Sequence, residues 1–193
     1  MHSMRTMARE VDIVSDEATD VQAAREDPSA FGVLYERYRD RVYAYLYTRT
    51  DSPEDAADLT QQVFLRALDA LPDYRGQHGM FAAWLFRIAR NAAIDFHRQR
   101  RPIVTWDLLP EALHPIAKDN PEANVVHQES IGRLHAILAT FNQDTRELLA
   151  LRFAARLTVA QTAAILGKSE AAVKKQLGRT MRRLKERYHD HTR

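Results

Sequence analysis

Apolar residues in the first third of the chain recur every three or four positions, the spacing that places them on one side of a helix. Asp27 and Pro28 precede this pattern and form a typical helix start, with aspartate as N-cap and proline at the first helical position. We therefore expect a helix to begin near residue 28 and to end before residues 51–53 (Asp-Ser-Pro). The apolar positions of this helix are Phe31, Leu34, Tyr38, Val42 and Leu46.

Two further helices follow in the first half of the sequence. Ser52 and Asp55 form a capping signal, and the pattern after them predicts a helix to about residue 71. Residues 72–79 are polar and contain glycine, which favours a loop. A third long helix is expected over about residues 80–100, and its core stripe is Phe81, Leu85, Ile88 and Ala92.

The second half of the sequence is interrupted by a proline-rich segment. Residues 102–124 hold four of the seven prolines, so we expect a linker there. Helices resume at about residue 125, with one to residue 140 and another from residue 142 to about 155. We find no strand pattern and no internal repeat. The fold class is therefore all-α: a flexible acidic tail (1–26), two small helical domains (27–101 and 125–193) and a flexible linker that lets them move independently.

The C-terminal part of the sequence predicts two helices joined by a tight turn. Thr158 and Gln161 have the spacing of a capping box, so a helix is expected to start there. Gly167 can adopt positive φ just after a helix end, and Ser169 is a good N-cap for the next helix. A helix that follows such a short turn is typical of a helix-turn-helix, whose second helix enters the DNA major groove.

The last helix has one apolar and one basic side. Val173, Leu177, Met181 and Leu184 share the first side, which we expect to face the core. From residue 168 to the C-terminus there are nine Lys or Arg and three Asp or Glu. A solvated helical hairpin is the alternative, but such surfaces usually mix both signs of charge. The candidate DNA-binding residues are Ser169, Ala171, Lys174, Lys175, Gly178, Arg179, Arg182 and Arg183.

Composition excludes several functional classes. The chain has 193 residues, a formal net charge of +2 and no cysteine, so disulfides, thiolate zinc sites and cysteine nucleophiles are excluded. The longest clearly apolar run, residues 81–86, is too short to cross a bilayer, and no signal-peptide pattern is present. We expect no membrane insertion and a cytoplasmic location. Charge is uneven: residues 1–28 have three Arg and seven Asp or Glu, whereas residues 87–101 have five Arg and one Asp.

Two further faces have polar patterns of different kinds. On the third helix an aromatic residue alternates with cations and an amide, a combination that stacks on bases, neutralises phosphate and reads base edges; Trp84 as a plain core residue is the alternative. The second helix has an acidic strip that would repel phosphate, so a protein-docking face or solvated surface explains it better. The third-helix residues are Trp84, Arg87, Asn91 and Arg98; the strip is Asp55, Asp58, Gln61 and Gln62, with Leu59 and Leu65 at its margins.

Three motifs together resemble those of bacterial RNA polymerase sigma factors, of the small extracytoplasmic-function (ECF) type in the sigma-70 family. Residues 55–66 are similar to the core-polymerase-binding motif. Residues 81–91, with Asp95 and Arg98, resemble the promoter-melting and minus-ten-reading helix. Residues 157–184 resemble the minus-thirty-five helix-turn-helix. The likeness covers about residues 31–188, and the short linker leaves no room for the extra middle domain of housekeeping members.

The resemblance implies that the two domains bind core RNA polymerase and promoter DNA, and that the chain is not an enzyme. Residues 27–101 would be sigma region 2 and residues 125–193 sigma region 4, acting on core RNA polymerase and on promoter DNA. The upstream element would be bound as duplex and the downstream element as a single strand. An anti-sigma protein is an expected partner; no cofactor, metal or catalytic residue is expected. The implied polymerase-binding residues are Asp55, Asp58, Leu59, Gln61, Gln62 and Leu65, and the implied minus-ten residues are Arg75, His78, Met80, Trp84, Arg87, Arg90, Asn91 and Arg98.

The sequence departs from the family pattern at several positions. Gln62 replaces a usual glutamate and removes one charge from the docking strip. Gln161 and Thr162 replace a usual Glu-Ile pair, and Lys175 with Gln176 replaces a common Ser-Arg pair. Gly178 lies inside the recognition helix, where glycine costs about 1 kcal/mol relative to alanine.

Two other functions compete with the sigma-factor interpretation. A plain DNA-binding regulator would need only the helix-turn-helix and would leave the other two motifs unexplained. An all-α di-iron enzyme uses paired Glu-x-x-His spacings, and the chain has two, at Glu111–His114 and Glu186–His189. The first lies in the proline-flanked linker and the second near the Arg-rich C-terminus, so neither is expected to face a bundle core.

Overall fold

A computed structural model gives the fold and describes residues 17–50, 52–76, 79–99, 134 and 136–190. Within these residues the regular structure is entirely helical, which confirms the all-α prediction. The expected linker, residues 102–124, lies outside the described residues, as does His78.

The first domain is built on three long helices, each of which starts where the sequence has a cap or a turn. Asp27 accepts a hydrogen bond from the backbone N–H of Ser29, although it caps a short 3₁₀ segment rather than the α-helix itself. Ser52 accepts from the backbone N–H of Asp55. The elements are a helix over residues 17–26, η1 (Pro28–Ala30), α2 (Phe31–Tyr47), α3 (Pro53–Ala70), η2 (Leu71–Asp73) and α4 (Phe81–Gln99).

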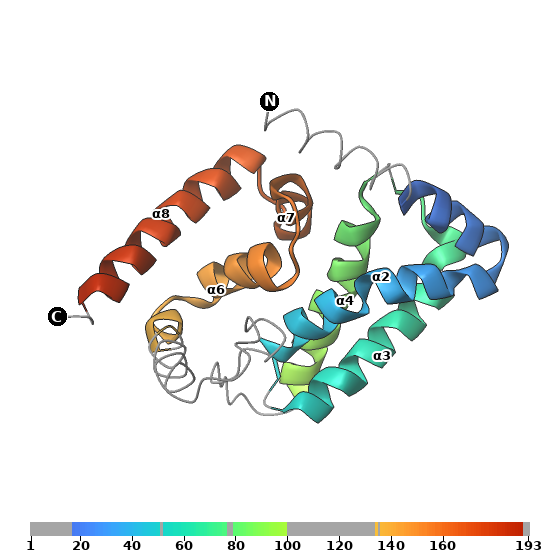
Figure 1. Ribbon diagram of the computed structural model, residues 1–193, viewed down its shortest axis with the longest axis horizontal. Helices are drawn as coiled ribbons and strands as arrows, with labels where there is room; N and C mark the ends of the chain where they lie inside the picture. Colours follow the sequence, from blue (N-terminus) through green and yellow to red (C-terminus); the bar gives the residue numbers. More distant parts are fainter. Residues whose placement is uncertain (1–16, 51, 77–78, 100–133, 135, 191–193) are drawn as a thin grey trace, which may run out of the picture.

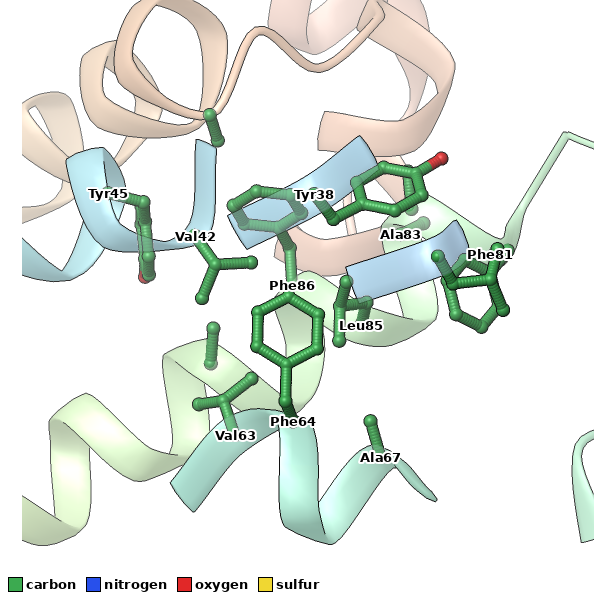
Figure 2. Packing of buried hydrophobic residues seen from close by; sticks show 14 of the residues in the cluster. Tyr38, Val42, Tyr45, Val63, Phe64, Ala67, Phe81, Ala83, Leu85 and Phe86 are labelled. Carbon is green, nitrogen blue, oxygen red and sulfur yellow. The ribbon is translucent and has the colours of Figure 1, made fainter. Parts of the chain in front are cut away.

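The core of the first domain forms where α2, α3 and α4 face one another (Figure 2). All five apolar positions predicted for α2 are buried. Phe86 of α4 is fully buried and meets Tyr45 of α2 edge to face, with ring centroids 5.7 Å apart. Burial of three interlocking apolar stripes fixes the outward faces of α3 and α4, which hold the candidate functional residues.

The predicted flexible tail, residues 1–26, is wrong at its C-terminal end, because residues 17–26 form a helix. Val21 and Ala24 pack into the core of the first domain. Two acidic side chains find partners on α2: Glu17 accepts a hydrogen bond from the Tyr38 hydroxyl, and Asp20 lies 2.6 Å from the Arg37 guanidinium. The acidic composition of residues 17–26 therefore does not prevent a helix, because Glu17 and Asp20 are paired with side chains of α2.

The second domain contains the predicted helix-turn-helix. Thr158 and Gln161 form a complete capping box, and Gly167 ends the helix in the left-handed conformation at φ 63°. Ser169 accepts a hydrogen bond from the backbone N–H of Ala172 at 3.2 Å, which confirms it as a cap. The helix predicted after Asn142 is α6 (Gln143–Leu149) followed by one π-helical turn, η4 (Ala150–Ala154); α7 (Val159–Leu166) and α8 (Glu170–Asp190) follow.

The two domains are packed against each other in this structure, and their independent movement stays a prediction. Leu151, Leu157 and Ile165 of the second domain belong to the same buried cluster as α2, α3 and α4. In Figure 1, α7 lies beside α4, and α8 is on the far side of α6 and α7 from the first domain. The contacts between the domains involve candidate DNA-binding residues and are described below.

Candidate polymerase and nucleic-acid surfaces

The acidic strip of α3 faces solvent. Asp58, Gln61 and Gln62 are exposed, and Asp55 is partly exposed in the first turn of the helix. Leu65 is the most exposed large apolar residue among the described residues, at 63%. An exposed leucine beside carboxylate and amide groups is typical of a protein contact surface, where an apolar centre is bordered by polar groups.

Leu59 does not belong to this surface. It is only 5% exposed and packs in the core of the first domain. Its position at the edge of the strip made it a candidate, but the edge of a helical face turns inward where neighbouring helices are close. Leu59 therefore holds α3 to its domain, and its inclusion among the docking contacts is wrong.

The outward face of α4 holds most of the minus-ten candidates. Arg87, Asn91 and Arg98 are exposed, and Arg90 is partly exposed. Arg98 forms an exposed ion pair of 3.3 Å with Asp95, one turn earlier on the same helix. Such a surface pair contributes little to stability and leaves the guanidinium accessible to phosphate.

Trp84 connects this face to the preceding loop. Its ring is partly buried and lies 5.0 Å from the ring of Tyr74 and 5.4 Å from that of Phe81, centroid to centroid. Trp84 is therefore partly a core residue, and its contact with nucleic acid stays a prediction. Arg75 on the loop is exposed and donates a hydrogen bond to the Pro72 carbonyl, and Met80 is partly exposed.

Two cations of the α4 face already contact the second domain. Arg87 donates a hydrogen bond of 3.1 Å to the carbonyl of Ala164 in α7. Arg90 lies 3.7 Å from the carboxylate of Glu147 in α6, an ion pair rather than a hydrogen bond. The sequence pattern predicted that these arginines face outward. It did not predict the contact between Arg90 and Glu147, because a single acidic residue in a short helix forms no pattern.

The outward face of α8 agrees with the sequence prediction residue by residue. Val173 is fully buried beneath the helix. Met181, however, is 40% exposed, and Thr180 is buried at 4%, so Met181 is the predicted core position that is wrong, whereas Leu177 and Leu184 pack inward as expected. The eight candidate DNA-binding positions are all exposed: Ser169, Ala171, Lys174, Lys175, Gly178, Arg179, Arg182 and Arg183.

The basic residues of α8 differ in their surroundings. Lys174 forms an exposed pair of 3.8 Å with Glu170. The Arg183 guanidinium lies 5.6 Å from the centre of the Phe141 ring, and Arg187 lies at the same distance. Arg183 is therefore partly held by a cation–π contact. A Cβ atom added at Gly178 would meet nothing within 4 Å, so packing within the described residues does not account for this glycine.

The di-iron alternative receives no support from the described residues. Among them no group of three or more His, Asp or Glu side chains is placed to hold a metal ion. Glu186 is exposed on α8, whereas Glu111, His114 and the side chain of His189 lie outside what the structure describes. None of the helices in the described part of the chain has the length and apolar content needed to span a membrane.

Comparison with known proteins gives the same family for both domains. Residues 34–103 match Sigma-70 region 2, and residues 131–184 match Sigma-70, region 4. The chain is 35% identical over 166 residues to the ECF RNA polymerase sigma factor BldN of Streptomyces coelicolor, covering 84% of this chain and 62% of BldN. It is 31% identical over 176 residues to the ECF RNA polymerase sigma factor SigD of Mycobacterium tuberculosis, covering 88% of this chain and 82% of SigD.

A solved structure agrees with these sequence matches. CnrH, solved in complex with the cytosolic domain of CnrY, superposes with a TM-score of 0.60 at 26% identity, over 86% of this chain and 92% of that chain. The likeness spans both helical domains. The chain belongs to the extracytoplasmic-function sigma factors of the sigma-70 family.

Proposed function

We propose that this sigma factor acts through three separate surfaces, each centred on one helix. The α3 strip binds core RNA polymerase, the α4 face with its preceding loop binds the single-stranded downstream element, and the outward face of α8 binds the duplex upstream element. Polymerase performs the chemistry, and this chain supplies promoter specificity and assists opening. The observation that best supports the proposal is the uniform exposure of the eight candidate residues, which lie at the Ser169 cap and along α8, the second helix of the helix-turn-helix.

The α3 surface is proposed to consist of Asp55, Asp58, Gln61, Gln62 and Leu65. We expect Asp58→Arg combined with Gln62→Arg to reduce promoter-specific run-off transcription at least about tenfold. The reason is that close charge pairs across protein interfaces contribute more than the 1.4 kcal/mol that corresponds to a factor of ten. Both positions are exposed, so the fold should be retained.

Run-off transcription with purified core polymerase on a promoter library tests both the surface and the function. Asp40→Arg, an exposed acidic residue on α2, is the matched charge-reversal control and should leave transcript levels unchanged. Absence of promoter-specific transcripts with the unaltered protein would contradict the proposed function. Equal activity of the double variant and the control would contradict only the assignment of the docking surface.

The α8 surface should contain residues of two kinds. Lys175 and Arg179, near the middle of the outward face, are proposed to read base edges, since recognition helices present their N-terminal part to the bases. We expect Lys175→Ala or Arg179→Ala to relax preference at one upstream position, at about 1–3 kcal/mol. Arg182→Ala should instead weaken binding to all sequences and reduce the salt slope by about 1.

Holoenzyme binding to upstream-element variants at several salt concentrations distinguishes the two effects. Arg183→Ala makes an informative comparison, because its contact with the Phe141 ring predicts a loss of stability in addition to weaker phosphate binding. If Lys175→Ala and Arg179→Ala both preserve affinity and preference, α8 does not read the promoter.

An inhibitory protein partner and a cytoplasmic location complete the proposal. CnrH was solved with the cytosolic domain of another protein bound, which supports the idea that this chain is also held by an anti-sigma protein. The chain must reach polymerase and DNA, and the described residues include no helix that could span a membrane. We propose no cofactor and no metal.

A further inference from the structure

Glu147 of α6 lies at the centre of the contact between the two domains. Its carboxylate accepts a hydrogen bond of 2.9 Å from the hydroxyl of Tyr45 and pairs with the guanidinium of Arg49. Arg90 of α4 approaches the same carboxylate at 3.7 Å. One acidic side chain of the second domain thus engages three groups of the first: one on α2, one in the turn after α2 and one on α4.

The arrangement around Glu147 is shielded from water. The Arg49 and Glu147 side chains are 8% and 13% exposed. Burial raises the pKa of Tyr45 far above its ordinary value, so the phenol keeps its proton and remains a donor to the carboxylate. Removal of one partner from a buried ion pair leaves an uncompensated charge, which is strongly unfavourable. Loss of the Glu147 charge would therefore favour separation of the domains, because separation returns Arg49 and Arg90 to water.

A second set of contacts holds the domains together away from Glu147. Arg41 of α2 donates hydrogen bonds to the backbone carbonyls of Ala155 and Arg156, at 2.9 and 3.3 Å. These carbonyls directly follow the π-helical turn of η4, and Arg156 has a positive φ of 52°. The irregular backbone leaves two carbonyl groups outside the helical pattern, where a cation of the other domain satisfies them.

These contacts place α7 against one part of the proposed downstream-DNA surface. The Gln161 side-chain amide donates to the carbonyl of Gly79, in the loop that leads into α4, at 2.9 Å. Arg87 is bonded to the carbonyl of Ala164. The Gly79 carbonyl, Arg87 and Arg90 are thus engaged by the second domain of the same chain, whose α7 lies beside α4 (Figure 1). Arg75, Asn91 and Arg98 remain exposed.

We propose that the second domain is an intramolecular competitor of single-stranded promoter DNA, latched onto the first domain by Glu147. In the free protein the latch keeps Arg87 and Arg90 occupied, and DNA binding requires the domains to separate. The inference rests on the proposed function only in assigning α4 to the downstream element. The closed arrangement itself depends on contacts within the chain.

A distance measurement without DNA tests the latch. The chain has no cysteine, so Ala70→Cys on α3 and Glu186→Cys on α8, both exposed, allow two-site spin or fluorophore labelling of the full chain. We expect one dominant, narrow distance population in the parent, with a minor fraction at longer distances, and a broad shift to longer distances in Glu147→Gln. Asp144→Asn removes an exposed charge from the same helix and should leave the distance distribution unchanged.

Two more variants exclude a simple folding defect. Arg41→Gln loosens the same interface at its other end and should open the chain without altering Glu147. Glu147→Arg combined with Arg49→Glu restores an opposite-charge pair and should recover part of the short-distance population. Unchanged distances in both Glu147→Gln and Arg41→Gln, with native circular dichroism, would overturn the latch and leave the proposed function intact.

Affinity for single-stranded DNA tests the competition. The probe is a fluorescent oligonucleotide with a downstream element selected in the transcription assay, added to the full chain. If about one molecule in ten is open in the parent, full opening in Glu147→Gln should tighten the apparent affinity about tenfold. A variant that opens but gains no affinity would overturn the competition. A lack of transcription by the parent holoenzyme would instead identify failure of the proposed function.

Discussion

Replacement of Phe86 by alanine should lower the free energy of unfolding by about 3–5 kcal/mol, the usual cost of deleting a fully buried aromatic ring. The Phe86 ring packs edge to face on Tyr45, at 83° between the ring planes. The Arg41 guanidinium lies 5.7 Å from its centre. The cavity would be enclosed by three long helices (Figure 2), so little collapse is possible, and the loss would be a large part of the total stability of about 5–15 kcal/mol.

Urea unfolding followed by circular dichroism measures this effect. Phe153→Ala is the matched control, since Phe153 is 53% exposed on the π-helical turn and exposed positions usually change stability by about 0.5 kcal/mol or less. Similar losses in the two variants would contradict the assignment of Phe86 to the core. Run-off transcription near the unfolding temperature should fall for Phe86→Ala, although this ring belongs to none of the three proposed surfaces.

The features that sequence predicted well depend on interactions between near neighbours. The Thr158–Gln161 capping box and the left-handed Gly167 involve residues within four positions of one another. The apolar stripe of α2 follows from helical geometry alone, and it is buried as expected. Local hydrogen bonds and side-chain spacing determine these features, so one sequence is sufficient to infer them.

Errors arose where a neighbouring element decided the burial of a residue. Leu59 and Met181 both lie at the edge of a helical face. There the angular spacing of 100° between successive side chains does not determine whether a side chain points in or out. Neighbouring helices bury Leu59, whereas Met181 is exposed and Thr180 is buried. The helix over residues 17–26 was missed for a related reason: the partner of Glu17 is Tyr38, 21 positions later.

The packing of the domains against each other had no sequence signal. Tyr45 and Arg49 lie 102 and 98 positions before Glu147, and helical periodicity carries no information over such separations. Arg87 and Arg90 fitted the pattern of a nucleic-acid surface, which says nothing about a second occupant of that surface. The candidate residues were therefore predictable, but their engagement by α6 and α7 was not.

Replacement of Trp84 by alanine should separate promoter opening from promoter anchoring. The part of the ring that packs on Tyr74 and Phe81 supports the loop, and the part that remains exposed is proposed to stack on an unpaired base. Stacking of one base on an aromatic ring is worth about 1–3 kcal/mol, which corresponds to a loss of up to about a hundredfold. We expect that loss on duplex promoters, where stacking must offset the cost of unstacking the base.

Run-off transcription on duplex promoters and on templates with a pre-melted bubble measures the difference. Bubble templates should lose much less activity, since strand separation is already complete. Trp84→Phe is the matched variant: it keeps an aromatic face and should retain most activity on both templates. Because Trp84 is partly buried, the unfolding midpoint of each variant is needed, with transcription assayed well below it. Equal loss on both templates by a folded Trp84→Ala would mean that the ring only supports the core and that another residue of the α4 face captures the strand.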